Sequence, residues 1–461
     1  MKRTLQEFAQ LCGGRLQGED RAFSAVSTDT RALRPGELYL ALRGPRFDGN
    51  DFLDVAAAAG AVGAVVDRAE QRDGLPLIVV ADSQAALTRA AAGWRALYPG
   101  VVVGVAGSNG KTTVKEMTAA ILAQAGSCLA TRGNLNNHIG VPLTLLRLER
   151  SQDFAVIEMG ANRAGEVAAL VSLAQPRIGL ITNAGAEHLE GFGDLDGVAR
   201  AEGEMVAGLP EQGVAIINAD DPYAGLWRGL TRAKVLTFGL TAAADFHATD
   251  IVEELAEAGF RIRYMLQSPA GSRAVQLNVG GRHNVSNSLA AAAAAVSAGA
   301  SLAHVTAGLA TMQPVQGRLQ PRRTTHGARL IDDSYNANPS SVRAGIDVLA
   351  SLGGRSWLVL GDMGELGDHA SASHVDIGRY AREHGVERLF ATGPLSTLAV
   401  EAFGNGAAWY QDTEALARAL DKDLGPEICV LVKGSRSNRL ERVVSALVGM
   451  KQVGTNHEQV H

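Results

Sequence analysis

The chain has 461 residues, more than one hydrophobic core normally serves, and this length indicates about three domains. Its 43 basic and 48 acidic residues give a net charge of −5, which argues against a protein that coats nucleic acid. Hydrophobic residues make up 46% of the chain and charged residues 20%, so we expect a folded protein rather than a disordered one.

The cysteines and the apolar runs bear on the cellular compartment. Cys12, Cys128 and Cys429 are widely spaced and form no CxxC pair, so neither a disulfide framework nor a zinc site is expected. The first residues lack the apolar core of a signal peptide, and no apolar run approaches the ~18 residues of a membrane span. We therefore expect a soluble, cytoplasmic protein.

Short β-branched runs alternate with alanine- and leucine-rich stretches along the chain, a pattern typical of parallel α/β layers. The runs predict strands at 101–106, 154–158, 178–183, 214–218, 330–332, 357–360, 389–392 and 428–432. Polar residues stand at the carboxyl ends of these runs, namely Glu158, Asn183, Asp220, Asp332, Asp362 and Lys433. In open parallel sheets this edge is where ligands bind.

Three blocks divide the chain. Residues 1–82 form a small α/β module, residues 83–312 hold a glycine loop after a strand, and residues 313–461 have strand–glycine-turn–helix units of a Rossmann-like kind. The polar tail from about Lys451 is expected to fray. The predicted class is α/β in three domains, the central one built on a mostly parallel sheet.

The strongest local motif is GSNGKTT at 107–113, which follows an apolar strand and precedes a helix-compatible stretch. Successive backbone N–H groups in such a turn make an anion cradle at the start of a helix. Lys111 would reach the β- and γ-phosphates, and the Thr112 hydroxyl would bind Mg²⁺. The spacing departs from the standard GxxxxGK[ST] loop, since Val105 stands five residues before Gly110. ATP is the predicted ligand.

Other polar residues are candidate metal or nucleotide ligands, but their sequence patterns are less specific than that of the phosphate loop. Glu158 at a strand end is a candidate Mg²⁺ ligand, and His188 follows another strand end, although a lone histidine is more often structural. Asn287, three residues after Asn284, offers carboxamides suited to adenine, but capping of a helix by Asn284 is an equal alternative. The GDMGELG turn at 361–367 lacks GxGxxG spacing and is a weak candidate for dinucleotide binding.

Six segments, in this order, resemble the Mur ligases, the ATP-dependent amide-forming enzymes of peptidoglycan precursor synthesis. They are DTRALRPGELYLALRGPRFDGNDF (29–52), GNLNNHIGVPLTLL (133–146), EMGAN (158–162), DDSYNANPSS (332–341), GDMGELG (361–367) and VKGSRS (432–437). The short GSNGKTT loop is similar to that family's own GxxGKTT form. The resemblance covers essentially the whole chain and points to the branch that adds a dipeptide.

The resemblance implies a three-domain fold and a reaction. The N-terminal module would hold a UDP-sugar, the central domain ATP, and the C-terminal domain the dipeptide. The carboxylate of UDP-N-acetylmuramoyl-tripeptide would take the γ-phosphoryl group to give an acyl phosphate. The amine of D-alanyl-D-alanine would then displace phosphate, while Lys111 and two Mg²⁺ ions offset the accumulating negative charge.

The resemblance also assigns residues. The phosphate loop is Gly107, Ser108, Asn109, Gly110, Lys111, Thr112 and Thr113, and the metal ligands are Thr112, Glu158 and His188. Further nucleotide contacts are Asn287, His283, Asn284, Arg318 and Asp333. Substrate contacts are Ser27, Thr28, Asp29, Arg31, Arg46, Phe47, Asp48, Asn134 and Asn137 on the UDP-sugar and peptide side, and Tyr335, Asn336 and Asn338 on the dipeptide side. No role is assigned to Lys433.

One position departs from the family pattern. Mur ligases usually carry, after the histidine loop, a lysine that reacts with CO₂ to form an anionic carbamate near the metals. Here VARAEGE (198–204) places Glu202 at that position. We hypothesise that this glutamate, a catalytic candidate with Lys111, Glu158 and His188, supplies a carboxylate without CO₂; a surface helix carboxylate is the plainer alternative.

Two other functions remain open. A P-loop kinase or simple ATPase would use the same phosphate loop, with outer domains that only regulate it. A sibling ligase, either another Mur enzyme or a folate polyglutamate ligase, would differ in substrate. The third residue of the acceptor peptide is not determined by the sequence.

Overall fold

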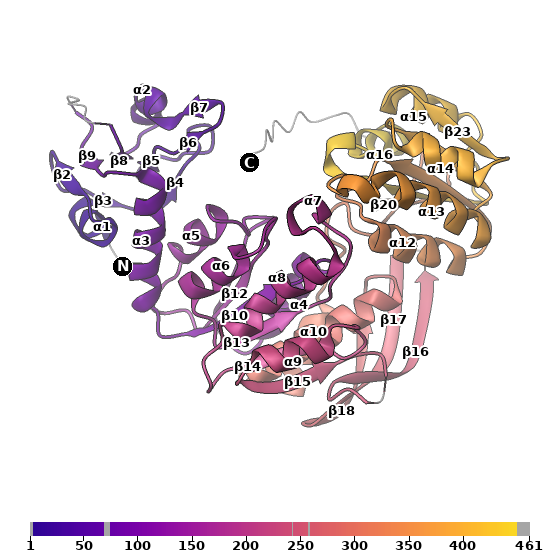
Figure 1. Ribbon diagram of the computed structural model, residues 1–461, viewed down its shortest axis with the longest axis horizontal. Helices are drawn as coiled ribbons and strands as arrows, with labels where there is room; N and C mark the ends of the chain where they lie inside the picture. The colour runs from indigo at the N-terminus through magenta and orange to yellow at the C-terminus, as the bar shows by residue number, and fades with distance from the viewer. Residues whose placement is uncertain (1–2, 69–73, 242, 257–258, 450–461) are drawn as a thin grey trace.

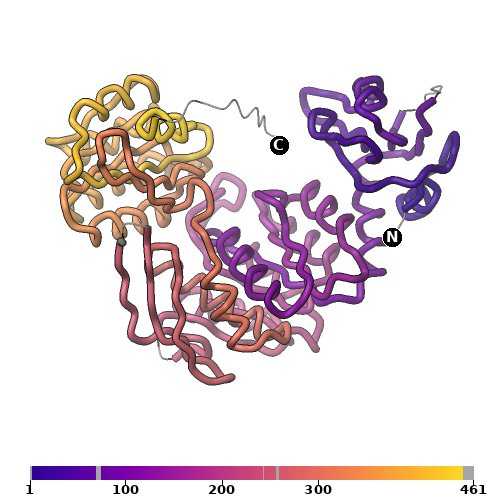
Figure 2. The backbone as a smooth tube through the Cα atoms, turned by 180° about the vertical axis from the view of Figure 1, so that it is seen from behind, coloured from indigo at the N-terminus to yellow at the C-terminus, as the bar shows by residue number. Residues whose placement is uncertain are grey.

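The computed structural model describes residues 3–68, 74–241, 243–256 and 259–449. The tail from Lys451, which was expected to fray, lies outside the described residues. The chain forms three lobes in a row, and the central lobe lies between the N-terminal and C-terminal lobes in both views (Figures 1 and 2). Within the described ranges, the first and the third lobe thus each adjoin the central one.

The N-terminal lobe is a five-stranded sheet in the order β2-β9-β8-β5-β4, parallel except for β2. Its strands are β2 (Arg15–Gln17), β4 (Val26–Ser27), β5 (Leu38–Leu40), β8 (Gly63–Val66) and β9 (Leu77–Val79). Two small ribbons accompany them, β1 (Arg3–Thr4) with β3 (Ala22–Phe23) and β6 (Arg43–Gly44) with β7 (Phe47–Asp48). The helices are α1 (Leu5–Cys12), η1 (Gly49–Phe52) and α2 (Leu53–Ala58).

The central lobe is a parallel six-stranded sheet in the order β11-β12-β10-β13-β14-β15. The strands are β10 (Val101–Ala106), β11 (Cys128–Ala130), β12 (Phe154–Glu158), β13 (Ile178–Ile181), β14 (Val214–Asn218) and β15 (Lys234–Phe238). Strand β10 lies between β12 and β13, so the loop after it meets the carboxyl ends of both neighbours. This is the edge at which parallel sheets bind ligands.

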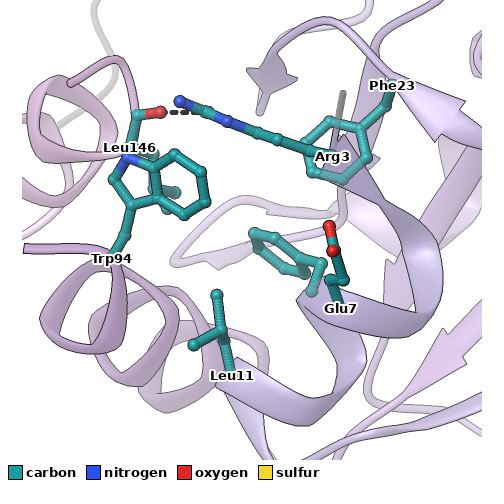
Figure 3. A pocket seen from close by; sticks show the side chains of 7 residues that line it. Arg3, Glu7, Leu11, Phe23, Trp94 and Leu146 are labelled. Carbon is teal, nitrogen blue, oxygen red and sulfur yellow. Dashed lines mark hydrogen bonds between the residues drawn. The ribbon is translucent and has the colours of Figure 1, made fainter. Parts of the chain in front are cut away.

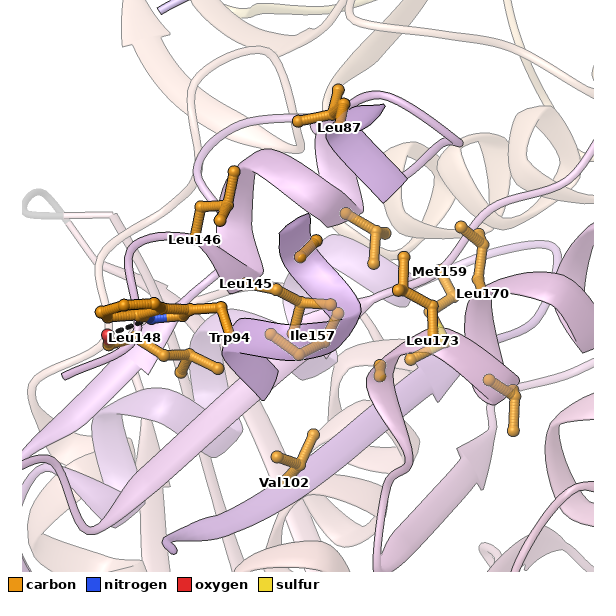
Figure 4. Close-up of a cluster of buried hydrophobic side chains, with 14 of the residues drawn as sticks. Leu87, Trp94, Val102, Leu145, Leu146, Leu148, Ile157, Met159, Leu170 and Leu173 are labelled. Carbon is orange, nitrogen blue, oxygen red and sulfur yellow. Dashed lines mark hydrogen bonds between the residues drawn. The ribbon is translucent and has the colours of Figure 1, made fainter. Parts of the chain in front are cut away.

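Helices cover both faces of this sheet, which explains why its strands are apolar throughout. One face packs on α3 (Ser83–Ala96), α5 (Gly140–Leu145), α6 (Glu166–Ala174) and α8 (Leu195–Ala207), as the buried side chains in Figure 4 show. The other packs on α4 (Lys111–Leu122), α10 (Arg282–Ser297) and α11 (Leu302–Ala310). The short α7 (Leu189–Phe192) and α9 (Ala224–Leu230) complete the lobe. The alanine run 290–295 is fully buried against this second face.

An antiparallel three-stranded sheet leads toward the third lobe. It consists of β16 (His247–Ala256), β17 (Gly259–Ser268) and β18 (Gly271–Leu277). Phe260 at the start of β17 is buried in the hydrophobic core of the C-terminal lobe, although other β17 residues belong to the central core. The ribbon therefore ties the two lobes together through packing.

The C-terminal sheet has the order β19-β20-β24-β21-β22-β23 and is parallel except for β19. Its strands are β19 (Gln320–Arg323), β20 (Arg329–Asp333), β21 (Arg355–Gly361), β22 (Arg388–Thr392), β23 (Ala407–Tyr410) and β24 (Ile428–Lys433). One face carries α12 (Pro339–Ser351), α13 (Ala370–Glu383) and α14 (Ser396–Phe403), and the other α15 (Thr413–Asp421) and α16 (Glu441–Val448). The short turns are η2 (Gly367–His369) and η3 (Arg436–Asn438).

The N-terminal lobe is fastened to the central lobe around one tryptophan (Figure 3). The Arg3 guanidinium lies 3.8 Å from the centre of the Trp94 ring and donates to the carbonyl oxygens of Leu146 and Leu148. The Trp94 indole N–H donates to the same Leu148 carbonyl at 2.8 Å. Phe8 and Phe23 of the N-terminal lobe and Leu146 of the central lobe line a small pocket beside this joint.

The α/β class expected from the sequence is confirmed. The predicted strands at 101–106, 154–158 and 214–218 coincide with β10, β12 and β14, while β13 ends at Ile181, two residues earlier than predicted. Among the described residues, no helix combines the length and the apolar character needed to cross a bilayer.

Candidate active site

The GSNGKTT segment is the turn between β10 and α4. Gly107 has φ +119° and Gly110 φ +84°, backbone conformations that favour glycine. A Cβ at Gly107 would overlap Thr182, and one at Gly110 would overlap the carboxamide of Asn287. The two glycines let the loop pass close to β13 and α10 and leave the first N–H groups of α4 facing the carboxyl edge of the sheet. Such a turn favours anions.

Lys111 begins α4 and folds back over this turn. Its ammonium donates to the carbonyl oxygens of Gly107 and Ser108 and lies 3.1 Å from a carboxylate oxygen of Glu187. Burial acts to lower the pKa of Lys111, but the charges of Glu187, Glu202 and Glu158 outweigh it and raise the pKa above its ordinary value. The lysine therefore stays positively charged at neutral pH.

Glu158, at the end of β12, lies beside the hydroxyl group of Thr112 in the phosphate loop. Its Oε1 accepts from the Thr112 hydroxyl at 3.3 Å and from the Asn136 amide at 2.9 Å. Its other oxygen is buried without a hydrogen-bond donor, and the closest charge is Lys115 at 3.7 Å. Lys115 is itself fully buried and donates to the Thr131 carbonyl oxygen at 2.8 Å.

This arrangement fits a hard cation. A buried carboxylate oxygen that lacks a donor beside a threonine hydroxyl is the kind of oxygen set that Mg²⁺ takes. Across the described part of the chain, no three His, Cys, Asp or Glu side chains converge into a complete metal cage. Magnesium in nucleotide sites normally uses one or two protein ligands together with phosphates and water, so a full cage is not required.

His188 caps α7, on the side of the central lobe that faces the C-terminal lobe (Figure 1). Its Nδ1 lies 2.9 Å from a carboxylate oxygen of Glu365. Burial acts to lower the pKa of His188, but the hydrogen bond to Glu365 and the charge of Glu187 outweigh it and raise the pKa. The structure thus places His188 beside the lysine–glutamate pair, with its Nδ1 turned to the other lobe.

Glu202 lies on the inner side of α8 and is 4% exposed, so the alternative of a surface carboxylate is wrong. One oxygen accepts from the backbone N–H of Gly107 at 2.6 Å, directly behind the phosphate loop. Burial raises the pKa of Glu202 to about 7, against the attraction of Lys111. At neutral pH this carboxylate is therefore poised between its neutral and charged forms.

The raised pKa of Glu202 predicts a pH-dependent stability. Because the folded protein holds this proton up to about pH 7 while an ordinary glutamate releases it near 4.5, stability is lost as pH rises through this window. The gap corresponds to about 3 kcal/mol at most. We expect Glu202→Gln, which cannot ionise and whose oxygen can still accept from Gly107, to lose less thermal stability than the wild type between pH 5 and pH 8.

Thermal unfolding followed by calorimetry at pH 5, 6.5 and 8 measures this difference. Glu211→Gln removes an exposed carboxylate of the same lobe and should follow the wild type at every pH. Superimposable pH profiles of Glu202→Gln and the wild type would contradict the expectation.

The C-terminal lobe touches the phosphate loop directly. The Arg318 guanidinium donates to the Thr112 hydroxyl at 3.2 Å and lies over the ring of Tyr335. The Asn338 amide, which also caps α12, donates to the side-chain oxygen of Asn109 at 2.8 Å. Asn109 in turn donates to the Ser340 hydroxyl at 3.0 Å. Residues more than 200 positions apart in the sequence thus form one edge of the site.

Lys433, which has no role assigned from the sequence, is the last residue of β24 and is buried. It is 3% exposed, and its ammonium lies 2.6 Å from Asp333 and 3.0 Å from the carbonyl oxygen of Asn336. Asp333 also accepts from the backbone N–H of Leu319. Lys433 therefore holds together the loop that carries Tyr335, Asn336 and Asn338.

The residues predicted to contact adenine surround the start of α10. Gly281 is the N-cap, and no side chain caps the helix, so the capping alternative for Asn284 is wrong. The Asn284 amide donates to the Gly280 carbonyl oxygen at 2.6 Å, and the Asn287 amide donates to Asn284. Asn287 packs against Gly110. Burial lowers the pKa of His283, so its ring is neutral.

The remaining predicted residues belong to the N-terminal lobe and to the loop before α5. Those of the N-terminal lobe are Ser27, Thr28, Asp29, Arg31, Arg46, Phe47 and Asp48. Asp29 forms an ion pair with Arg31 at 2.9 Å, and Phe47 is 44% exposed. Asn134 is exposed in the 131–137 loop, while Asn137 accepts from the N–H groups of Ile139 and Gly140 at the start of α5.

Sequence reasoning missed four residues of this site. Asn136, Lys115, Glu187 and Glu365 all contact predicted residues within hydrogen-bonding or ion-pair distance. Lys115 carried a signal, since lysine occurs only seven times in a chain that otherwise uses arginine. Glu187 adjoins His188 in the sequence, and Glu365 lies in the GDMGELG segment, to which no single site residue was assigned.

Comparison with known proteins agrees with this geometry. Residues 22–103 match the family described as "Mur ligase family, catalytic domain", 105–295 the "Mur ligase middle domain" and 317–436 the "Mur ligase, glutamate ligase domain". The UDP-N-acetylmuramoyl-tripeptide--D-alanyl-D-alanine ligase of Escherichia coli (strain K12) is 47% identical over 96% of this chain and 98% of its own length.

Two solved structures extend the similarity to the fold. MurF from Acinetobacter baumannii superimposes with a TM-score of 0.90 at 34% identity, over 97% of this chain and 99% of that one. The MurF ligase from Thermotoga maritima in complex with ADP gives 0.80 at 26% identity, over 92% and 97% of the two chains.

A phosphate loop at the carboxyl edge of a parallel sheet, with a second α/β lobe against it, is the architecture of a nucleotide-binding enzyme. The matched families and the relative at 47% identity make the assignment specific. The chain belongs to the Mur ligase family.

Proposed function

We propose that this enzyme uses ATP to join D-alanyl-D-alanine to UDP-N-acetylmuramoyl-tripeptide, in the cytoplasmic synthesis of peptidoglycan precursors. The observation that supports it most is the contact of Arg318 and Asn338 with the phosphate loop, because it brings the C-terminal lobe, which would bind the dipeptide, against the loop that would bind ATP. The E. coli relative, 47% identical over 96% of the chain, is named for the same reaction.

The chemistry follows from the weakness of a carboxylate as an electrophile. Transfer of the γ-phosphoryl group of ATP to the peptide carboxylate forms a P–O bond, releases ADP and gives an acyl phosphate. The amine of the dipeptide then attacks the acyl carbon, loses a proton, and expels phosphate. Negative charge accumulates when one anion approaches another, and the Lys111 ammonium offsets it.

We assign the metal and nucleotide contacts to the residues around the loop. Thr112 and Glu158 would hold one Mg²⁺ and His188 a second, and these ions would neutralise phosphate charge when bound. Arg318 would contact the nucleotide. His283, Asn284 and Asn287 would form the adenine side, with Asp333 held in place by Lys433.

The three blocks would divide the substrates among them. Residues 1–82 would hold the UDP-sugar through the segments at 27–31 and 46–48, and residues 83–312 would hold ATP, with Asn134 and Asn137 near the peptide. Residues 313–461 would hold the dipeptide through Tyr335, Asn336 and Asn338. The enzyme would act as a monomer.

Glu202 is proposed to take the place of the carbamylated lysine of other Mur ligases. It is buried, it hydrogen bonds to Gly107, and it interacts with the charges of Lys111, Glu187 and His188. A fixed carboxylate at this point needs no CO₂. Nearby magnesium would favour its ionised form, since cations stabilise a neighbouring negative charge.

A phosphate-release assay tests the proposal. With ATP and UDP-N-acetylmuramoyl-tripeptide present, we expect sustained phosphate release only when D-alanyl-D-alanine is added, with little release for single amino acids. A kinase or a simple ATPase would turn over ATP without the dipeptide and so refute the ligase. In bicarbonate-depleted buffer the rate should be unchanged, and a strong dependence on CO₂ would refute the role of Glu202.

A further inference from the structure

The contact between His188 and Glu365 joins a loop of the central lobe to a turn of the C-terminal lobe. His188 follows β13 in the central lobe, and Glu365 belongs to GDMGELG, the turn after β21 in the C-terminal lobe. The proposed reaction leaves this turn without a role. Its acidic side chain nevertheless lies 2.9 Å from the Nδ1 atom of His188.

Both residues of the pair have a left-handed backbone. His188 has φ +48° and Glu365 φ +62°, and only six non-glycine residues in the described ranges have positive φ. Such conformations are unfavourable for residues with a Cβ and persist where the surrounding structure enforces them. Two of the six meet in one contact, which indicates that the fold is shaped to make it.

The turn that carries Glu365 is fixed by hydrogen bonds from its backbone. The N–H of Gly364 donates to the Ser435 hydroxyl at 2.6 Å, and the N–H of Met363 donates to Nε2 of the buried His374 at 3.0 Å. On the other side, Glu187 ties the histidine loop to Lys111. The pair therefore connects the phosphate loop to a rigid edge of the C-terminal sheet.

The hydrogen bond between His188 and Glu365 determines which nitrogen of the ring carries the proton. An ionised carboxylate only accepts hydrogen bonds, so His188 donates from Nδ1, and in the neutral ring Nε2 is the nitrogen with the lone pair that a metal would take. A carboxylate that binds the distal nitrogen of a metal-binding histidine fixes its tautomer and its ring orientation. Here the carboxylate comes from a different lobe than the histidine.

We propose that Glu365 is a positioning residue that prepares His188 for a metal ion, so that this metal site is complete only when the C-terminal lobe lies against the central lobe. The inference rests on the proposed function, which assigns His188 to magnesium. It adds that metal affinity and lobe closure are coupled through one side chain.

ADP binding measured by calorimetry, in excess Mn²⁺ and separately in EDTA, tests the proposal. Glu365 is exposed, so its loss should leave folding intact. We expect Glu365→Ala to weaken ADP binding about tenfold in Mn²⁺ and by less than about twofold in EDTA. Glu365→Gln, whose amide oxygen still accepts, should show a smaller loss. Asp368→Ala removes an exposed carboxylate three residues further along the chain, in η2, and should match the wild type.

A double-mutant cycle with His188→Ala decides how Glu365 acts. If the effect passes through the histidine, Glu365→Ala should cause no further loss in the His188→Ala background. An equal loss in both backgrounds, an equal loss in Mn²⁺ and EDTA, or no loss at all would overturn the proposal. If Mn²⁺ does not tighten ADP binding to the wild type, the metal role in the proposed function fails as well.

Discussion

Replacing Lys111 by alanine is expected to lower kcat by about a thousandfold, the scale of effect seen when a group that stabilises transition-state charge is removed. The ammonium lies over the phosphate loop between two loop carbonyl oxygens and Glu187. Without it, the carboxylates of Glu187, Glu202 and Glu158 would repel an incoming triphosphate. Nucleotide affinity should therefore fall together with the rate of phosphoryl transfer.

The measurement is ADP and phosphate release with both substrates at saturation, together with the dissociation constant for ADP. Lys422→Ala is a matched control, because it removes an exposed lysine of the C-terminal lobe. A rate for Lys111→Ala within tenfold of the wild type would show that this lysine does not stabilise the transferred phosphoryl group.

Glu158→Gln should have the second largest effect, a loss of about a hundredfold in kcat with a rise of at least about tenfold in the Mg²⁺ concentration needed for half-maximal rate. Glutamine keeps the size and can still accept hydrogen bonds from Thr112 and Asn136. It cannot supply the negative charge at the buried oxygen that now lacks a donor. The expected loss therefore isolates the charge from the hydrogen bonds.

Titration of the ligation rate with Mg²⁺ measures this effect. Glu116→Gln neutralises another partner of Lys115, 2.8 Å away, and serves as the control for changes that pass through that lysine. An unchanged Mg²⁺ requirement in Glu158→Gln would exclude this carboxylate as the metal ligand.

Much of the fold could be predicted because its strands correspond to short apolar runs in the sequence. Apolar runs at 101–106, 154–158 and 214–218 became β10, β12 and β14, since strands buried on both faces must be apolar throughout. The carboxyl ends of β10, β12 and β13 lie together because these strands are parallel neighbours. This property of parallel sheets was enough to predict that Glu158 and Asn183 lie near the phosphate loop.

The contacts between lobes could not be predicted in the same way. Glu365 reaches His188, and Asn338 reaches Asn109, through loops whose neighbours in space are far away in sequence. A left-handed backbone at Glu365 leaves no signal in the sequence, because it results from the packing around the turn. Lys115 was missed because a lysine inside a helix usually faces water, whereas this one is fully buried.

Because Arg3 stacks on Trp94, the fluorescence of this tryptophan should respond to movement between the N-terminal and central lobes. Indole emission responds to a nearby cation and to the polarity around the ring, and this ring lies where the first lobe meets the second. Trp227 and Trp357 are buried within single lobes and Trp409 is on the third, so replacing these three by phenylalanine would leave Trp94 as the one tryptophan, which can be excited selectively above the tyrosine absorption. Time-resolved fluorescence of that variant would report rotation of the first lobe without any attached dye.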